Sequence, residues 1–117
     1  MKSIKKMSLP KKIKKIDPAV RKIVLDYASR LEQGNIPIKS LYVFGSHARG
    51  KAKKYSDIEV CIVSPSLRRN WWKNSHKLWR ARESIDLRLE PHGYAPEDFV
   101  SEDPLVYEIK KYGVKVM

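Results

Sequence analysis

Residues 41–63 read LYVFGSHARGKAKKYSDIEVCIV, and this stretch decides the fold. Two apolar runs are separated by a basic connection that contains the turn Gly45-Ser46. In the second run Ile58, Val60 and Ile62 alternate with polar residues, and a period of two is typical of a β-strand with two different faces. We therefore expect strands over 38–44 and 56–63, joined by the turn and a short basic helix over 47–53.

The rest of the chain predicts helices and further strands around this pair. Asp-Pro pairs are typical of helix starts, and glycine is typical of helix ends. We expect, in chain order, a helix from Asp17 to Gly34, a helix over 67–83, a strand over 84–90 that Pro91 and Gly93 end, a helix from Asp103 to Gly113, and an edge strand over 114–117. This order predicts an α/β or α+β fold, with helices packed on a mixed sheet of about four strands.

The chain is strongly basic, with a net charge of +12 over 117 residues. Residues 1–16 contain seven lysines and no acidic residue, so this segment carries more than half of the net charge. We interpret 1–16 as a basic N-terminal extension and 17–117 as a single domain. A basic extension attracts polyanions such as nucleic acid, but it also serves as a solubilising tail, and composition leaves both interpretations open.

Several classes of protein do not fit the composition. No apolar run approaches the roughly 20 residues that span a membrane, and the basic N-terminus lacks the apolar segment of a secretory signal. The single cysteine, Cys61, excludes an internal disulfide and suits a reducing cytoplasm, where we expect the protein to act. Cys61 itself is interpreted as a small buried side chain of its strand.

Acidic residues mark one face of the predicted sheet. Asp57 and Glu59 lie two apart on a strand, roughly 7 Å between Cα atoms, and Asp86 alternates with apolar residues on the next strand. Two such charges repel by roughly 2 kcal/mol at an effective dielectric of 20, which a bound Mg²⁺ or Mn²⁺ relieves. Alternating acids also occur on ordinary solvated strand faces. The nearby Gly45-Ser46 turn, which offers N–H groups and a hydroxyl to a phosphate, favours a phosphoryl-transfer site.

The connection also matches the spacing of a P-loop, but this interpretation fails. Gly45, Gly50 and Lys51 fit the pattern, whereas Ala52 stands where a Ser or Thr hydroxyl holds the metal ion. A P-loop lysine begins a substantial helix, and the next predicted strand starts too soon after Lys51 to leave room for one. The stretch therefore predicts a phosphate-holding turn of another kind.

Three motifs together resemble one family. VFGSHARG at 43–50, SDIEV at 56–60 and SIDLRL at 84–89 are similar, in order and spacing, to motifs of the polymerase-beta-type nucleotidyltransferase superfamily, and most similar to its minimal nucleotidyltransferases. The end of the chain, DPLVYEIKKYGVKVM, resembles the closing helix and strand of these small domains. The resemblance covers residues 38–117 and implies a nucleotidyltransferase fold.

The resemblance also implies an activity and a set of site residues. Family members transfer a nucleoside monophosphate from an NTP, often ATP, to a hydroxyl group. By this likeness Gly45 and Ser46 hold the triphosphate, and Asp57, Glu59 and Asp86 are catalytic residues that bind Mg²⁺, with Mn²⁺ as an alternative. Arg49 either aids the phosphates or is a surface cation. Glu59 departs from the aspartate of many members, which puts full activity in doubt.

Minimal nucleotidyltransferases resemble antitoxins encoded beside a HEPN-domain toxin, and the likeness implies such a partner, with a tyrosine hydroxyl as the AMP acceptor, in a hetero-complex or dimer. Two other functions stay open. Trp72 and Trp79 share a face of the predicted helix over 67–83, which suits a binding module that neutralises a partner by contact. The same helix interleaves aromatic and basic residues, and with 1–16 it also fits direct binding of nucleic acid.

Overall fold

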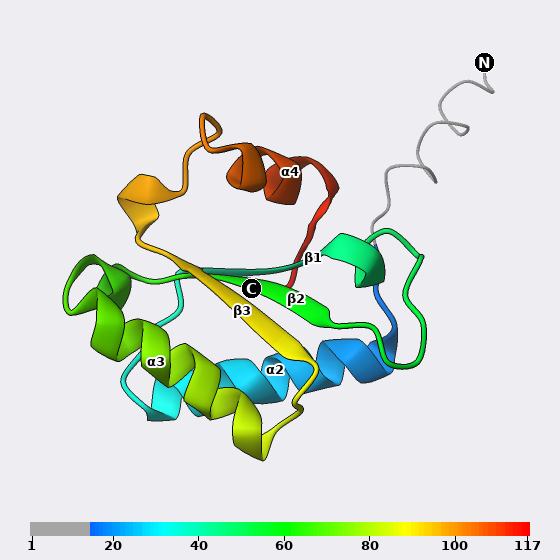
Figure 1. Ribbon diagram of the computed structural model, residues 1–117, viewed down its shortest axis with the longest axis horizontal. Helices are drawn as coiled ribbons and strands as arrows, with labels where there is room; N and C mark the ends of the chain where they lie inside the picture. Colours follow the sequence, from blue (N-terminus) through cyan, green and yellow to red (C-terminus); the bar gives the residue numbers. More distant parts are fainter. Residues whose placement is uncertain (1–14) are drawn as a thin grey trace.

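The computed structural model describes residues 15–117, which form a four-stranded mixed sheet with helices around it (Figure 1). The strands are β1 (Ser40–Phe44), β2 (Ile58–Val63), β3 (Leu89–Tyr94) and β4 (Val114–Lys115), in the spatial order β3-β2-β1-β4. β1 is antiparallel to β2 and β4, whereas β2 and β3 are parallel and are joined by a crossover through α3 (Trp71–Ala81). The expected α+β fold with a mixed sheet is confirmed.

Helices cover both faces of the sheet. α2 (Pro18–Gln33) and α3 lie on one face, and α4 (Pro104–Tyr112) lies on the other (Figure 1). Alternate strand residues contribute to the two cores: the larger core under α2 and α3 contains Ile58, Val60 and Ile62, and the smaller core under α4 contains Cys61 and Val63. Since burying one such aliphatic side chain contributes roughly 1.5–3 kcal/mol, the two cores hold β2 in one orientation.

The predicted helix starts at Asp17 and Asp103 are confirmed. The Asp17 carboxylate accepts a hydrogen bond from the N–H of Ala19 at 2.7 Å, and the Asp103 carboxylate accepts one from the N–H of Leu105 at 2.8 Å. The hydroxyl of Tyr27 donates to the carbonyl of Leu78 at 2.6 Å, so a buried hydrogen bond joins α2 to α3. Within residues 15–117 no helix has the length and apolar character needed to cross a bilayer.

Two helix predictions were too long. Instead of a helix over 47–53 the chain forms one 3₁₀ turn, η1 (Gly45–His47). The expected helix over 67–83 is divided at Asn70, whose φ of 49° is left-handed, so α3 starts only at Trp71. This start turns Trp71, which was expected to face inward, to the surface with 44% of its area exposed, while Leu78 is buried. The left-handed backbone at Asn70 does not continue a helix, so it separates the 3₁₀ turn over Pro65–Arg68 from α3.

The third strand was predicted in the wrong place. β3 begins at Leu89 instead of residue 84, and it continues through Pro91 and Gly93, which were expected to end it. Within residues 15–117, β3 is an edge strand that pairs with β2 alone, so a proline without an N–H is tolerated there. The absence of a side chain at Gly93 lets Leu67 and Leu78 approach the strand closely. Of the predicted extension over 1–16, only Lys15 and Ile16 lie within the described residues.

Candidate active site

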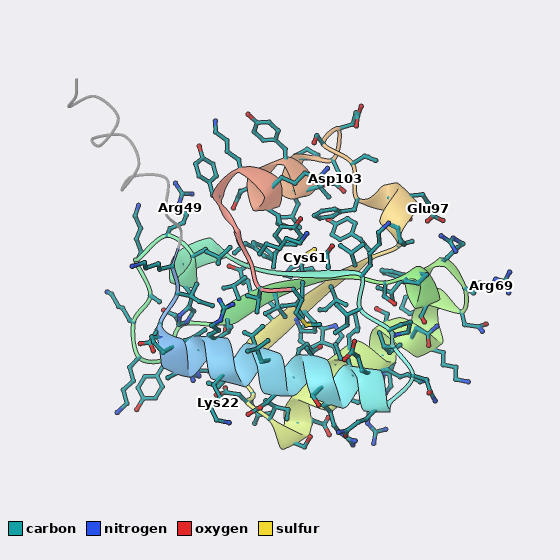
Figure 2. The ribbon with its side chains drawn as sticks, turned by 180° about the vertical axis from the view of Figure 1, so that it is seen from behind. Lys22, Arg49, Cys61, Arg69, Glu97 and Asp103 are labelled. Carbon is teal, nitrogen blue, oxygen red and sulfur yellow. The ribbon has the colours of Figure 1, made fainter. Side chains whose placement is uncertain are left out.

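The carboxylates of Asp57 and Glu59 lie at the start of β2. Asp57 immediately precedes the strand and is exposed, while Glu59 is its second residue and is partly buried. Glu59 shares its face of the strand with Cys61, which is fully buried between the sheet and α4 (Figure 2). Burial raises the pKa of the Cys61 thiol to about 12, which excludes this cysteine as a nucleophile at neutral pH and agrees with its expected role as a filler.

The Gly45-Ser46 turn lies directly against Glu59. Gly45 follows β1 with a left-handed φ of +76°, and a Cβ added to it would overlap the Oε2 atom of Glu59. Ser46 lies within η1, and the carbonyl of Gly45 accepts hydrogen bonds from the N–H groups of Ala48 and Arg49, both at 3.1 Å. Only glycine satisfies both the backbone conformation and the close approach. Gly45 and Glu59 are therefore in direct contact, and the role of the turn in holding a phosphate stays a prediction.

Two residues of β3 complete the cluster, and both were missed at the sequence level. In the parallel pair, Glu59 is the register partner of Glu90, and Cys61 is the partner of His92. The Oε1 atom of Glu59 lies 3.9 Å from Nε2 of His92, and one ligand atom from each of Glu59, Glu90 and His92 can be chosen so that all lie within 4.8 Å of one another. Two carboxylates and an imidazole at this spacing fit a divalent cation.

The electrostatics of the cluster favour a bound cation. The pKa of Glu59 is raised, first by burial and then by the negative charges of Glu90, Asp57 and Glu108. Glu108 lies on α4, so this helix adds a fourth acidic group that the sequence motifs did not indicate. Burial lowers the pKa of His92, which keeps the imidazole neutral and able to bind a metal. A cation is the simplest group that relieves the repulsion among these charges.

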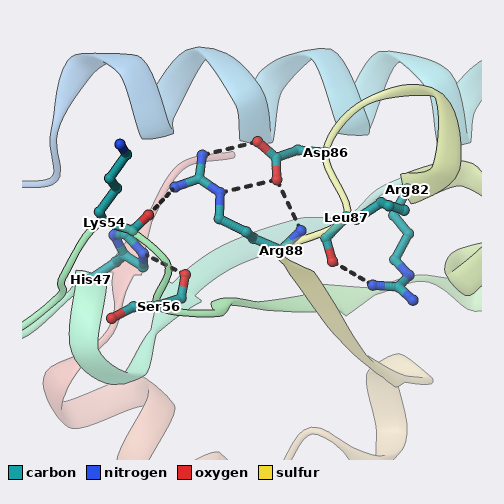
Figure 3. A network of polar contacts seen from close by, with 7 residues as sticks. All are labelled: His47, Lys54, Ser56, Arg82, Asp86, Leu87 and Arg88. Atoms are coloured by element: carbon teal, nitrogen blue, oxygen red, sulfur yellow. Dashed lines mark hydrogen bonds and ion pairs between the residues drawn. The ribbon is translucent and has the colours of Figure 1, made fainter.

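Asp86 lies outside this cluster, contrary to the prediction that it sits on a strand beside Asp57 and Glu59. It precedes β3, and its carboxylate pairs with the guanidinium of Arg88, with Nη2 to Oδ2 at 2.9 Å and Nε to Oδ1 at 3.1 Å (Figure 3). It also accepts the backbone N–H of Arg88 at 2.9 Å. These hydrogen bonds lower the pKa of Asp86 and close a local turn, which keeps it out of the strand ladder. Glu90, which alternates with Asp86 and Arg88 in the sequence, takes the place expected for Asp86.

Arg49 is held against α4. Its Cζ atom lies 4.7 Å from the centre of the Tyr112 ring, a cation–π contact at the start of the connection that follows the Gly45-Ser46 turn (Figure 2). The side chain is exposed, so the contact leaves its N–H groups accessible to an anion. Arg49 thus lies near the Gly45-Ser46 turn and also packs on Tyr112.

A pocket of about 190 Å³ adjoins the carboxylates, lined by Asp57, Glu90, Trp79, Leu87 and neighbouring residues. Trp79 comes from α3, and the guanidinium of Arg82 lies 5.0 Å from the centre of its ring. The same guanidinium donates to the carbonyl of Leu87 (Figure 3). Apolar side chains from α3 and from the crossover to β3 therefore line this pocket together with Asp57 and Glu90.

A glycine-serine turn beside clustered carboxylates on a mixed sheet is an arrangement expected of phosphoryl-transfer enzymes. The sequence model described as "Nucleotidyltransferase domain" matches residues 20–116, and the chain belongs to this family, as the resemblance implied.

Two solved structures share the fold. A candidate nucleotidyltransferase from Sulfolobus solfataricus is 16% identical, with a TM-score of 0.58 over 83% of this chain and 78% of that chain. A chain in the structure of a toxin–antitoxin with AMP-PNP is 20% identical, with a TM-score of 0.53 over 79% of this chain and 71% of that chain. A comparison with curated protein sequences gives no match.

Proposed function

We propose that this nucleotidyltransferase domain transfers AMP from ATP to a hydroxyl group, with a divalent cation, Mg²⁺ or Mn²⁺, held by its carboxylates. The observation that carries the proposal is the meeting of Asp57, Glu59 and Glu90 beside the Gly45-Ser46 turn. The family match supports nucleotidyl transfer as the reaction, and the geometry supports these residues as its centre.

In this proposal each residue has a defined task. Gly45, Ser46 and Arg49 hold the triphosphate. The bound cation supplies charge neutralisation and polarises the phosphoryl oxygens. The Glu90 carboxylate accepts the proton of the acceptor hydroxyl. The oxygen of that hydroxyl bonds to the α-phosphorus of ATP, and the bond from this phosphorus to the pyrophosphate oxygen breaks. We assign this last task to Glu90, because the carboxylate of Asp86 is occupied by Arg88.

The pocket next to Glu90 supports an aromatic hydroxyl as the acceptor. Trp79 and Leu87 present apolar surface there, 42% and 65% exposed respectively, and Asp57 and Glu90 also line the pocket. A tyrosine ring packed on Trp79 and Leu87 brings its hydroxyl to the carboxylates. This arrangement favours a tyrosine over a small polyhydroxylated acceptor, which offers no ring to these two side chains.

We further propose that the tyrosine belongs to a HEPN-domain toxin and that the protein acts as its antitoxin. The likeness to a chain of a toxin–antitoxin structure supports a protein partner. The exposed tryptophans of α3 add support, because Trp72 is 85% exposed and Trp71 is 44% exposed on the helix that also carries Trp79. Exposed tryptophans are typical anchors of protein interfaces. A partner docked on α3 therefore lies next to the acceptor pocket.

The test uses the full chain with labelled ATP, Mg²⁺ or Mn²⁺, and the protein encoded next to it. We expect label on a tyrosine of the partner and its loss with Asp57→Asn. The matched control is Asp26→Asn, which removes an exposed carboxylate on α2 that pairs with Lys22 at the surface, and transfer should persist there. Absence of transfer by the wild-type protein, or equal transfer by Asp57→Asn, would contradict the proposal.

A second candidate function is neutralisation of the partner by contact alone. The exposure of Trp71, Trp72 and Trp79 along one helix favours it, as does Glu59 in a position where many relatives of this kind carry Asp. Calorimetry separates the two functions: tight binding of the partner, unchanged by Asp57→Asn and without affinity for ATP or divalent cations, supports contact alone.

A further inference from the structure

His92 has a buried polar atom that the proposed reaction does not use. Its Nε2 atom is buried and has no hydrogen-bond partner among the described residues. A polar atom buried without a hydrogen-bond partner destabilises the fold, so such an atom needs an explanation. The contact to Glu59 does not supply one, because 3.9 Å is too long for a hydrogen bond.

The ring of His92 is held in place by packing. His92 on the edge strand β3 is paired in register with Cys61 of β2, and its ring packs edge-on against Phe44 with 5.1 Å between ring centres. Phe44 is the last residue of β1 and is almost fully buried, 2% exposed. The imidazole is therefore held on the same face as Glu59 and Glu90, toward the Gly45-Ser46 turn.

The spacing of the three side chains is close to that around one ion. Ligands bound at about 2.0–2.2 Å on opposite sides of a cation lie roughly 4.4 Å apart. The donor atoms of Glu59, Glu90 and His92 all lie within 4.8 Å of one another, so small side-chain movements bring them onto a common ion. Such an ion would satisfy Nε2 of His92 and neutralise the facing carboxylates at once.

We propose that Nε2 of His92 is a direct ligand of the cation held by Glu59 and Glu90, and that this nitrogen makes the site prefer Mn²⁺ to Mg²⁺. Imidazole suits first-row transition ions, whereas Mg²⁺ takes carboxylate, carbonyl and water oxygens and dehydrates reluctantly. The inference deepens the proposed function, because it concerns the cation of the same site. Binding of the ion, however, needs neither ATP nor an acceptor.

The test is pulsed electron paramagnetic resonance of Mn²⁺ bound to the full chain without nucleotide. We expect a nitrogen coupling that changes when histidine is labelled with ¹⁵N and that disappears in His92→Gln. The other two histidines serve as matched controls: His47→Gln and His76→Gln should keep the coupling. Calorimetry should show that His92→Gln lowers the preference for Mn²⁺ over Mg²⁺ by about tenfold or more.

Absence of Mn²⁺ binding, Mn²⁺ bound without nitrogen coupling, or coupling that persists in His92→Gln would each overturn the inference. If His92→Gln does not fold, the ¹⁵N experiment on the wild-type protein with the His47 and His76 variants still decides the outcome. Failure of AMP transfer with the coupling present would refute the proposed function and leave the His92 ligand intact. AMP transfer with bound Mn²⁺ but without a nitrogen coupling would refute the His92 ligand and leave the proposed function intact.

Discussion

Glu59 on β2 and Glu90 on β3 are register partners across the parallel edge of the sheet. Their carboxylates therefore face the same side, next to the Gly45-Ser46 turn and below α4. The strand crossover through α3, and not a sequence motif, brings Glu90 to this position. The predictions below follow from this pairing and from the residues around it.

Glu90→Gln should reduce AMP transfer by roughly 10²–10⁴-fold, since it removes the carboxylate that accepts the proton of the acceptor. Asp86→Asn should keep a rate near that of the wild-type protein, because Asp86 contacts Arg88 and not the carboxylate cluster. Initial rates of label transfer, with circular dichroism to confirm folding, measure both. A larger loss in Asp86→Asn than in Glu90→Gln would show that Asp86 is the third acidic residue of the site.

Gly45→Ala and Gly50→Ala form a matched pair. Both glycines have a left-handed φ, +76° and +72°, so each alanine should cost roughly 1–2 kcal/mol in unfolding free energy. A Cβ at Gly50 meets nothing within 4 Å, whereas one at Gly45 overlaps Glu59. Gly45→Ala should therefore be the more destabilising change and alone should weaken Mn²⁺ binding. Denaturant unfolding and calorimetry measure the two effects, and equal effects at both positions would contradict the close approach of Glu59.

Glu59→Gln should stabilise the protein in the presence of a chelator. The ionised carboxylate faces Glu90 across the strands, and like charges directly opposite one another destabilise a sheet, so neutralising Glu59 should raise the unfolding free energy by roughly 0.2–1 kcal/mol near pH 7. The same variant should lose most of the increase in melting temperature that Mn²⁺ gives the wild-type protein. Thermal unfolding with and without Mn²⁺ tests both. If Glu59→Gln is less stable than the wild type in the presence of a chelator, that result would argue against repulsion among the carboxylates of the cluster.

The ion pair of Asp86 with Arg88 predicts a dependence of stability on pH. The folded pKa of Asp86 lies below its ordinary value of 3.8, so its contribution to stability is fully present above that value and is lost as pH falls through the folded pKa. The difference in unfolding free energy between the wild type and Asp86→Asn should be roughly 1 kcal/mol at pH 6–7 and should shrink below about pH 4. Urea unfolding across this range measures it, and a difference that grows as pH falls would contradict the prediction.

Trp72→Ala should separate docking from folding. Trp72 is 85% exposed, so its removal should change the unfolding free energy by less than about 0.5 kcal/mol, whereas Leu78→Ala on the same helix should cost roughly 2–5 kcal/mol. If the partner docks on α3, Trp72→Ala should raise the KM for the partner with little change in kcat. Unchanged kinetics and affinity in this variant would place the docking surface elsewhere.

The sequence by itself determined the features that depend on neighbouring residues. The alternation in 56–63 predicted which residues of β2 face each core, and the Asp-Pro pairs predicted two helix starts, because period and capping are local properties. The order of Gly45-Ser46 and Asp57-Ile58-Glu59 likewise predicted that the turn lies near the acidic pair. Glu59 does contact Gly45, because β1 and β2 are adjacent antiparallel strands and Phe44 pairs with Glu59.

Only the tertiary structure decided which residues after β2 lie beside Glu59 and the Gly45-Ser46 turn. Asp86, Arg88 and Glu90 alternate equally well in the sequence, so the period alone cannot say where the strand begins. Pairing of β3 with β2 starts the strand at Leu89, and the hydrogen bonds of Asp86 to Arg88 keep Asp86 in the preceding turn. The edge position of β3 admits Pro91 and carries the strand on to His92. Long-range strand pairing therefore selected Glu90 and His92, because register between distant segments is a property of the packed sheet and not of either segment.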